Sequence, residues 1–146
     1  MATMIQKLRE ETGAGIMDCK RALDEAAGDY NLAKQLIEKQ GLAKAAKKAE
    51  RETGAGLLEA YIHNGRVGVL LELKSETDFV ARSEPVKALA HNLALQIAAM
   101  APETVEDLLR KPYVKDEEKA VEEIIKGTIA LVGENLKVAR FARYQL

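Results

Sequence analysis

"LLEAYIHNGRVGVLLEL", residues 57–73, decides the fold that the sequence predicts. Two apolar runs flank Asn64-Gly65, and this dipeptide is the strongest short-range signal for a two-residue type I′ turn between antiparallel strands. In the second run the pattern changes to a period of two, which places alternate residues on one face of a strand. The residues on that face are Val67, Val69, Leu71 and Leu73. We therefore expect a β-hairpin with one face turned toward a core.

The segments after the hairpin predict helices and a further strand. Ser83 and Pro85 are start signals for a long helix, whose apolar face would carry Val86, Leu89, Ala90, Leu93, Ile97 and Met100. Residues 101–113 indicate a turn with one short helix, and residues 116–132 indicate another helix. The last stretch is typical of a strand, although Val138 and Phe141 share a face only if the strand contains a bulge. The prediction is an α+β fold in which helices pack on one side of a small antiparallel sheet.

The N-terminal third, residues 1–41, predicts three short helices. A Gly-rich "TGAG" ends the first helix, Gly28 ends the second and Gly41 ends the third, which Asp29 or Asn31 can cap. Helices this short are marginal on their own, so we expect them to pack against one another.

The stretch "LAKAAKKAERE", residues 42–52, is rich in alanine and charge and has high helix propensity with a thin apolar face. We interpret residues 42–55 as a helical connector and residues 56–146 as an α+β core domain. The four basic side chains of the connector, those of Lys44, Lys47, Lys48 and Arg51, could touch phosphates. Neighbouring glutamates and the lack of interleaved aromatic residues favour a solvated helix over that reading.

Composition narrows the class of protein. The 146 residues include 47% hydrophobic and 31% charged residues, with a net charge of −1, which is typical of a soluble globular protein. A nucleic-acid surface would usually carry a basic excess, and no apolar run is long enough for a membrane span. The charged start and the single Cys19, which we interpret as a small buried hydrophobe, favour a cytoplasmic protein without disulfides. We expect neither direct nucleic-acid binding nor membrane association.

The sequence contains no clear catalytic constellation. His and Cys residues do not have the spacing of metal ligands, and the phosphate-loop and nucleophile-elbow motifs are missing. We therefore expect no cofactor, no metal site and no enzyme that makes or breaks bonds.

Phe79 is the residue that folding alone explains least well. It is one of two phenylalanines and lies in "KSETDFVARSEP", residues 74–85, where a strand gives way to a turn. The ring either folds back to close the core or faces a partner, and the pattern leaves both readings open. Aromatic anchors with acidic neighbours are typical of binding hot spots.

Several motifs carry a resemblance to a known family. "LREETGAGIMDCKRAL", "AKAAKKA", "RVGVLLELKSETDFVAR", "VGEN" and the closing "VARFARYQL" occur in the order seen in translation elongation factor Ts. The chain resembles this family over nearly its whole length. The resemblance implies a ubiquitin-associated-type domain formed by the three N-terminal helices, followed by a core or dimerisation domain.

The resemblance also implies a function, guanine-nucleotide exchange on elongation factor Tu, the GTPase that delivers aminoacyl-tRNA. In the family, the N-terminal domain docks on the GTPase domain, the TDF motif enters a cleft beside the magnesium and nucleotide site, and the segment before the last strand adds contacts. The implied partner-binding residues are Arg9, Ile16, Met17, Thr77, Asp78, Phe79, Val80, Val132, Gly133, Glu134 and Asn135. Val132 replaces the isoleucine usual in the family.

One departure from the family pattern lies in the middle of the core. Many members have two tandem core subdomains, or a longer single one with an extra helical hairpin, whereas few residues separate the long helix from "KPYVKD" here. A single core copy suggests a homodimer that supplies the second core surface. The alternative function is a ubiquitin-associated-like adaptor that binds a protein partner and has no exchange activity.

Overall fold

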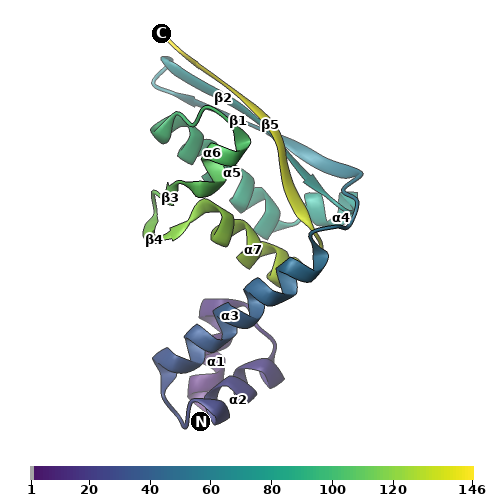
Figure 1. Cartoon of the computed structure of the whole chain (residues 1–146), viewed down its shortest axis with the longest axis vertical. Coiled ribbons are helices and arrows are strands. Elements are labelled where there is room, and N and C mark those ends of the chain that lie inside the picture. Colours follow the sequence, from purple (N-terminus) through teal and green to yellow (C-terminus); the bar gives the residue numbers. More distant parts are fainter. Residues whose placement is uncertain (1) are drawn as a thin grey trace.

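The computed structural model describes residues 2–146. Its N-terminal part consists of α1 (Ala2–Thr12), α2 (Ile16–Glu25) and α3 (Tyr30–Lys48). These helices pack around a core of their own, at the opposite end of the molecule from the sheet (Figure 1). Asp29 caps α3, because its carboxylate accepts a hydrogen bond from the Leu32 backbone N–H at 3.2 Å. The buried residues of this core are Leu8, Cys19, Ala22, Leu23, Ala26, Ala33 and Ile37.

The predicted end of the third helix at Gly41 is wrong. Helix α3 continues through Gly41 to Lys48, although a glycine in a helix costs about 1 kcal/mol relative to alanine. Helix α7 (Val121–Val132) lies close to α3 at this point, because a Cβ atom at Gly41 would come within 3.4 Å of the Cβ of Ala130, which leaves room for only a small side chain. Farther along α3, Ala45 is buried in the second core. The residues after Gly41 thus extend the third helix and do not form a separate one.

A three-stranded antiparallel sheet forms the centre of the second core. It consists of β1 (Ala55–His63), β2 (Val67–Ser75) and β5 (Leu136–Gln145), with β2 in the middle. Asn64 and Gly65 have positive φ angles of 52° and 66°, as a type I′ turn requires. The last pair of the ladder joins His63 to Val67, so three residues and not two separate the strands.

The bulge predicted for the last strand is present. Val138 pairs with Leu73 and Arg140 pairs with Glu72, which leaves Ala139 as the extra residue of β5. Val138 and Phe141 can therefore both pack against the same core, with Val138 fully and Phe141 partly buried.

Helices cover one face of this sheet, which confirms the α+β fold. Helix α5 (Glu84–Met100) lies on the inner face and buries the predicted apolar stripe, except that Met100 at its C-terminal end is 39% exposed. Helix α7 packs beside α5, and α6 (Val105–Arg110) packs against α7 and β5 (Figure 1). Within residues 2–146, no element covers the outer face of the sheet.

The predicted helix over residues 116–132 begins too early. Residues Asp116–Ala120 form β4, which pairs with β3 (Pro112–Tyr113), and α7 starts only after this small hairpin. The buried side chain of Gln96 explains the extended backbone. Its Nε2 donates to the carbonyl of Pro112 at 3.0 Å, and its Oε1 accepts from the N–H of Val114 at 2.8 Å. The local sequence pattern of residues 112–120 does not reveal these two hydrogen bonds from Gln96.

Candidate partner-binding site

Phe79 is held on the outside of the molecule by its own neighbours. It belongs to α4 (Asp78–Ala81), a single helical turn of four residues directly after β2. Val80 and Ala81 are 9% and 2% exposed, whereas Phe79 is 82% exposed. Successive residues of a helix point in different directions, so burial of the next two side chains leaves the ring in solvent. The reading in which Phe79 closes the core is therefore wrong.

Thr77 connects this turn to a distant part of the chain. Its hydroxyl accepts a hydrogen bond from the Val80 N–H at 3.3 Å and so caps α4. The same residue donates twice to the carboxylate of Glu134, from its backbone N at 3.0 Å and from Oγ1 at 2.8 Å. Gly133 ends α7 with a left-handed φ of 77°, and this turn directs Glu134 toward Thr77.

Asn135 joins a third segment to the same place. Its side chain is only 6% exposed. Its Nδ2 donates to the carbonyl of Ala49 at 3.4 Å and to that of Arg51 at 2.9 Å, while its backbone N donates to Glu76 Oε2 at 2.6 Å. Arg51 Nη1 also lies 3.7 Å from that Glu76 oxygen. We call the group Arg51, Glu76, Thr77, Glu134 and Asn135 the junction.

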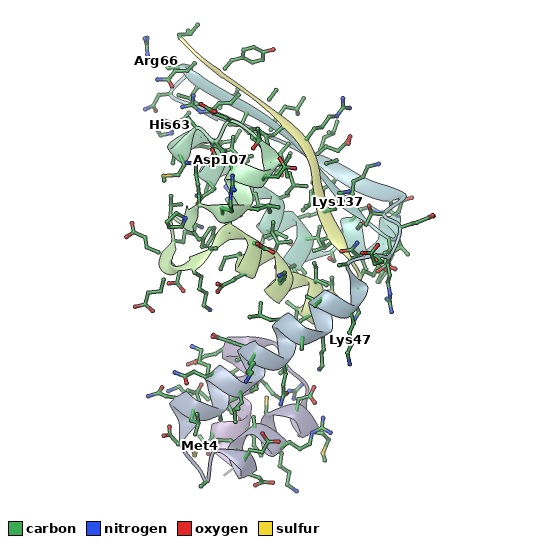
Figure 2. The ribbon with its side chains drawn as sticks, viewed as in Figure 1. Met4, Lys47, His63, Arg66, Asp107 and Lys137 are labelled. Atoms are coloured by element: carbon green, nitrogen blue, oxygen red, sulfur yellow. The ribbon has the colours of Figure 1, made fainter. Side chains whose placement is uncertain are left out.

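The junction brings together residues that the sequence did not connect. Thr77 and Glu134 were expected at the partner site, but their direct contact was not, and neither was the participation of Arg51 and Glu76. Figure 2 shows Lys47 on the last turn of α3 and Lys137 near the start of β5, the two elements that lead into the junction. A separation of 57 residues between Thr77 and Glu134 leaves no trace in local periodicity.

The other predicted residues form a second group on the N-terminal helices. Ile16 and Met17, on the first turn of α2, are 52% and 62% exposed, and Arg9 on α1 is exposed as well. Asp78 is exposed beside Phe79, whereas Val132 is partly buried against the second core. The structure therefore divides the predicted residues between the two ends of α3.

Charged neighbours stabilise the N-terminal helices that carry the second group. The guanidinium of Arg21 and the ammonium of Lys44 hold the pKa of Asp18 below its usual value. Lys44 lies 3.3 Å from Asp18 and ties α3 to α2, so this member of the basic stretch is engaged within the chain. Burial raises the pKa of the Cys19 thiol, in keeping with a small buried side chain.

Metal-binding clusters and membrane-spanning helices are both absent from residues 2–146. No cluster of three or more His, Cys, Asp or Glu side chains there has the arrangement needed to hold a metal ion. In the same range, no helix combines the length and the apolar character that crossing a membrane requires.

Comparison with known proteins identifies the family. A family model described as Elongation factor TS matches residues 26–107 and 76–146. Elongation factor Ts of Coprothermobacter proteolyticus is 41% identical over 191 aligned positions, which cover 99% of this chain and 97% of that protein. The chain belongs to the elongation factor Ts family. It is therefore a translation elongation factor, a protein of protein biosynthesis.

The alignments with other members of the elongation factor Ts family also cover nearly all of this chain. The protein from Oleidesulfovibrio alaskensis is 40% identical, with 99% of this chain and 96% of that protein covered. The protein from a Nostoc species is 47% identical over 146 positions, with 99% of this chain but 46% of that protein covered.

The comparisons also bear on the short middle of the core. The alignment with the Coprothermobacter protein runs over 191 positions although this chain has 146 residues, so that elongation factor Ts contains residues without a counterpart here. Membership of the family supports the exchange function that the motifs implied, and it does not favour the adaptor alternative.

Proposed function

We propose that this chain is a guanine-nucleotide exchange factor for elongation factor Tu, which it induces to release GDP by inserting the TDF motif near the magnesium and nucleotide site. The observation that carries the proposal is the exposed ring of Phe79 on a short helical turn. Thr77 caps this turn, Glu134 holds Thr77, and the side chains of Val80 and Ala81 anchor the turn in the core. An exposed aromatic side chain on a rigid support is suited to insertion into a partner, because little order is lost on binding.

The mechanism requires differential binding and no bond chemistry. An exchange factor binds the nucleotide-free GTPase more tightly than the nucleotide-bound form, and by linkage the nucleotide weakens the factor equally. Accelerating release about a thousandfold requires roughly 4 kcal/mol. Burial of one Phe supplies about 1.5–3 kcal/mol. Phe79 alone falls short, so a second contact must add to it.

The exposed pair Ile16 and Met17 provides that second contact in our proposal. Docking of α1 and α2 on the GTPase domain, with Arg9 beside them, would hold Phe79 against the ion pocket. Asp78, exposed on the same turn, would disturb the polar contacts that position the magnesium ion or the phosphate loop. The factor itself needs no cofactor for this work and is not an enzyme in the sense of bond chemistry.

The finer organisation of the chain belongs to the same proposal. Residues 1–41, of which residue 1 lies outside the described part, would form a ubiquitin-associated-type docking domain. Residues 42–55 would connect it to the core domain of residues 56–146. The separate buried clusters of the two parts support this division, with α3 contributing to both. The single, buried Cys19 supports a cytoplasmic location, because the chain is built without disulfides.

We further propose that two copies pair through the outer face of the sheet. Leu58 and Ile62 on β1, Leu70 on β2 and Tyr144 on β5 are exposed on that face, and the ladder brings Leu70 opposite Ala60 and Ala142. An apolar face on a single core copy fits a second copy related by a two-fold axis, which would supply the other core surface. Light scattering of wild type and Leu70→Glu tests this, since a wild-type monomer would reject it.

The exchange function is tested by stopped-flow release of a fluorescent GDP from elongation factor Tu. The wild-type chain should accelerate release in a saturable manner, and the effect should fall when excess nucleotide-free elongation factor Tu is added, because that form binds the factor more tightly. Binding without any acceleration would reject exchange and support the adaptor alternative.

A further inference from the structure

Both oxygens of the Glu134 carboxylate are already occupied within the chain. Oε1 accepts from the Thr77 backbone N–H at 3.0 Å, and Oε2 accepts from the Thr77 hydroxyl at 2.8 Å. A carboxylate that receives two such bonds in a fixed geometry gains little by turning to another protein, because the first partners would be lost. Glu134, which is partly exposed, is therefore already paired with the cap of the Phe79 turn.

The side chain of Asn135 is occupied in the same way. The two N–H groups of Nδ2 are directed at two carbonyl oxygens, those of Ala49 and Arg51, and the side chain is buried. Its backbone N–H is taken by Glu76, the residue that precedes Thr77. Asn135 therefore links the segment after α3 to the segment before α4, and it offers no free donor to a partner.

Helix α4 depends on these contacts for its shape. A helix of four residues is not stable alone, because nucleation is unfavourable and only one or two backbone hydrogen bonds offset its cost. Its cap, Thr77, has a hydroxyl that donates to Glu134 while accepting from Val80. Loss of Glu134 would free the hydroxyl and the backbone of Thr77 together, and the direction of the next residues would no longer be fixed.

We propose that Glu134 and Asn135 are positioning residues, which act on the partner through Phe79 by fixing the Thr77 turn and its distance from the end of α3. This inference rests on the proposed exchange function and changes the role that family resemblance implied for the two residues. Phe79 touches the partner, and the junction sets the angle and the place at which it does so. The exchange step depends on this angle because a displaced ring does not reach the pocket.

The variants Glu134→Ala and Glu134→Gln separate positioning from direct contact. Both remove the charge, but glutamine keeps two hydrogen bonds to Thr77, since its Oε1 accepts from the backbone N–H and its Nε2 donates to the hydroxyl. The positioning role predicts that alanine lowers the maximal exchange rate about tenfold and that glutamine recovers most of it. Equal loss in both variants would show a charge contact with the partner and overturn the proposal. Glu117→Ala, exposed on β4 at the other end of α7, is the matched control.

The concentration dependence of exchange gives a second distinction. Met17→Ala should mainly raise the concentration of factor at half-maximal rate, because it weakens docking. Glu134→Ala should mainly lower the maximal rate and leave that concentration within about twofold, because docking through α2 is intact. A loss of folded protein alone would raise the apparent half-maximal concentration of factor and leave the maximal rate unchanged, because only the folded fraction acts on the partner.

A readout independent of exchange is available because the chain contains only two phenylalanines. Fluorine NMR of protein labelled with para-fluorophenylalanine should show two signals, and a Phe79→Leu sample assigns them. Glu134→Ala should shift or narrow the Phe79 signal, glutamine should not, and the Phe141 signal should stay in place in both. Asn135→Ala should move the Phe79 signal as well; should it fail to fold, the Glu134 pair still decides.

The two readouts separate the two proposals. An unchanged Phe79 signal in Glu134→Ala overturns the positioning role, whatever the exchange rates are. A shifted Phe79 signal in a protein that never accelerates GDP release, even as wild type, retains the positioning role and rejects the exchange function on which its use depends.

Discussion

Replacement of Phe79 by alanine is the most direct perturbation of the proposed site. The ring is 82% exposed, so its removal takes little area from the core. Thr77 still caps α4, and Val80 and Ala81 still anchor it. We therefore expect the free energy of unfolding to change by less than about 0.5 kcal/mol, as for other exposed positions.

The effect on exchange should be much larger than the effect on folding. If the partner buries the ring, its loss removes about 1.5–3 kcal/mol of stabilisation from the complex. One factor of ten corresponds to about 1.4 kcal/mol, so nucleotide release at subsaturating factor should slow roughly 10- to 150-fold. Phe79→Leu retains a large apolar side chain and should lose only part of this.

Stopped-flow release of fluorescent GDP measures the rates, and thermal unfolding followed by circular dichroism measures stability. The expected series is wild type, then leucine, then alanine in falling order of rate, with closely similar melting temperatures. A Phe79→Ala protein with the wild-type rate would refute the insertion of this ring. A melting temperature lowered by many degrees would refute the structural premise that the ring packs against nothing in its own chain.

Three further predictions concern stability. Gln96→Leu should lower the free energy of unfolding by about 1–3 kcal/mol in urea denaturation, because it removes two partly buried hydrogen bonds, to the carbonyl of Pro112 and from the N–H of Val114. Gly56→Ala would place a Cβ 2.6 Å from the carbonyl oxygen of Leu73 and should cost about 1–3 kcal/mol; Gly54→Ala, with no atom within 4 Å, should cost almost nothing in the same assay. Burial, with the carboxylate of Glu11 nearby, raises the pKa of Tyr30 to about 12. The unfolded chain ionises first, so stability should fall as pH rises from 10 through 12, and Tyr30→Phe should show a smaller fall in melting temperature over that interval.

Local patterns predicted the sheet well, because the forces that shape it act between near neighbours. Asn64-Gly65 adopts the positive φ angles of the turn, and the alternation of β2 is reproduced in its burial. Even the bulge at Ala139 followed from the conflict between Val138 and Phe141. A conflict between two periodic signals was itself informative.

The errors lie where a distant residue overrides the local signal. Gly41 has the character of a helix end, but α7 packs so closely against α3 that a small residue is favoured inside the helix. Residues 116–120 have acceptable helix propensity, yet Gln96 holds the preceding backbone extended. Both partners are far away in the sequence, and neither belongs to a recognisable motif.

The candidate site divides in the same way. The sequence pattern singled out Phe79 but did not show whether its ring points into the core or into solvent. The direction of a side chain that follows a strand depends on how the backbone turns there. Burial of Val80 and Ala81 settles that direction. Asn135 was expected to contact a partner, and its burial with bonds to Ala49 and Arg51 was not foreseeable from any spacing.

The unbroken course of α3 from Tyr30 to Lys48 imposes a condition on its length. Each residue added to a helix advances it by about 1.5 Å and rotates everything beyond it by about 100°. A single insertion after Gly41 would swing Met17 around the axis while Phe79 stayed where it is. Evolution can thus exchange exposed side chains of this segment that make no ion pair, but it can neither add nor delete a residue without altering the angle between the two ends of the molecule.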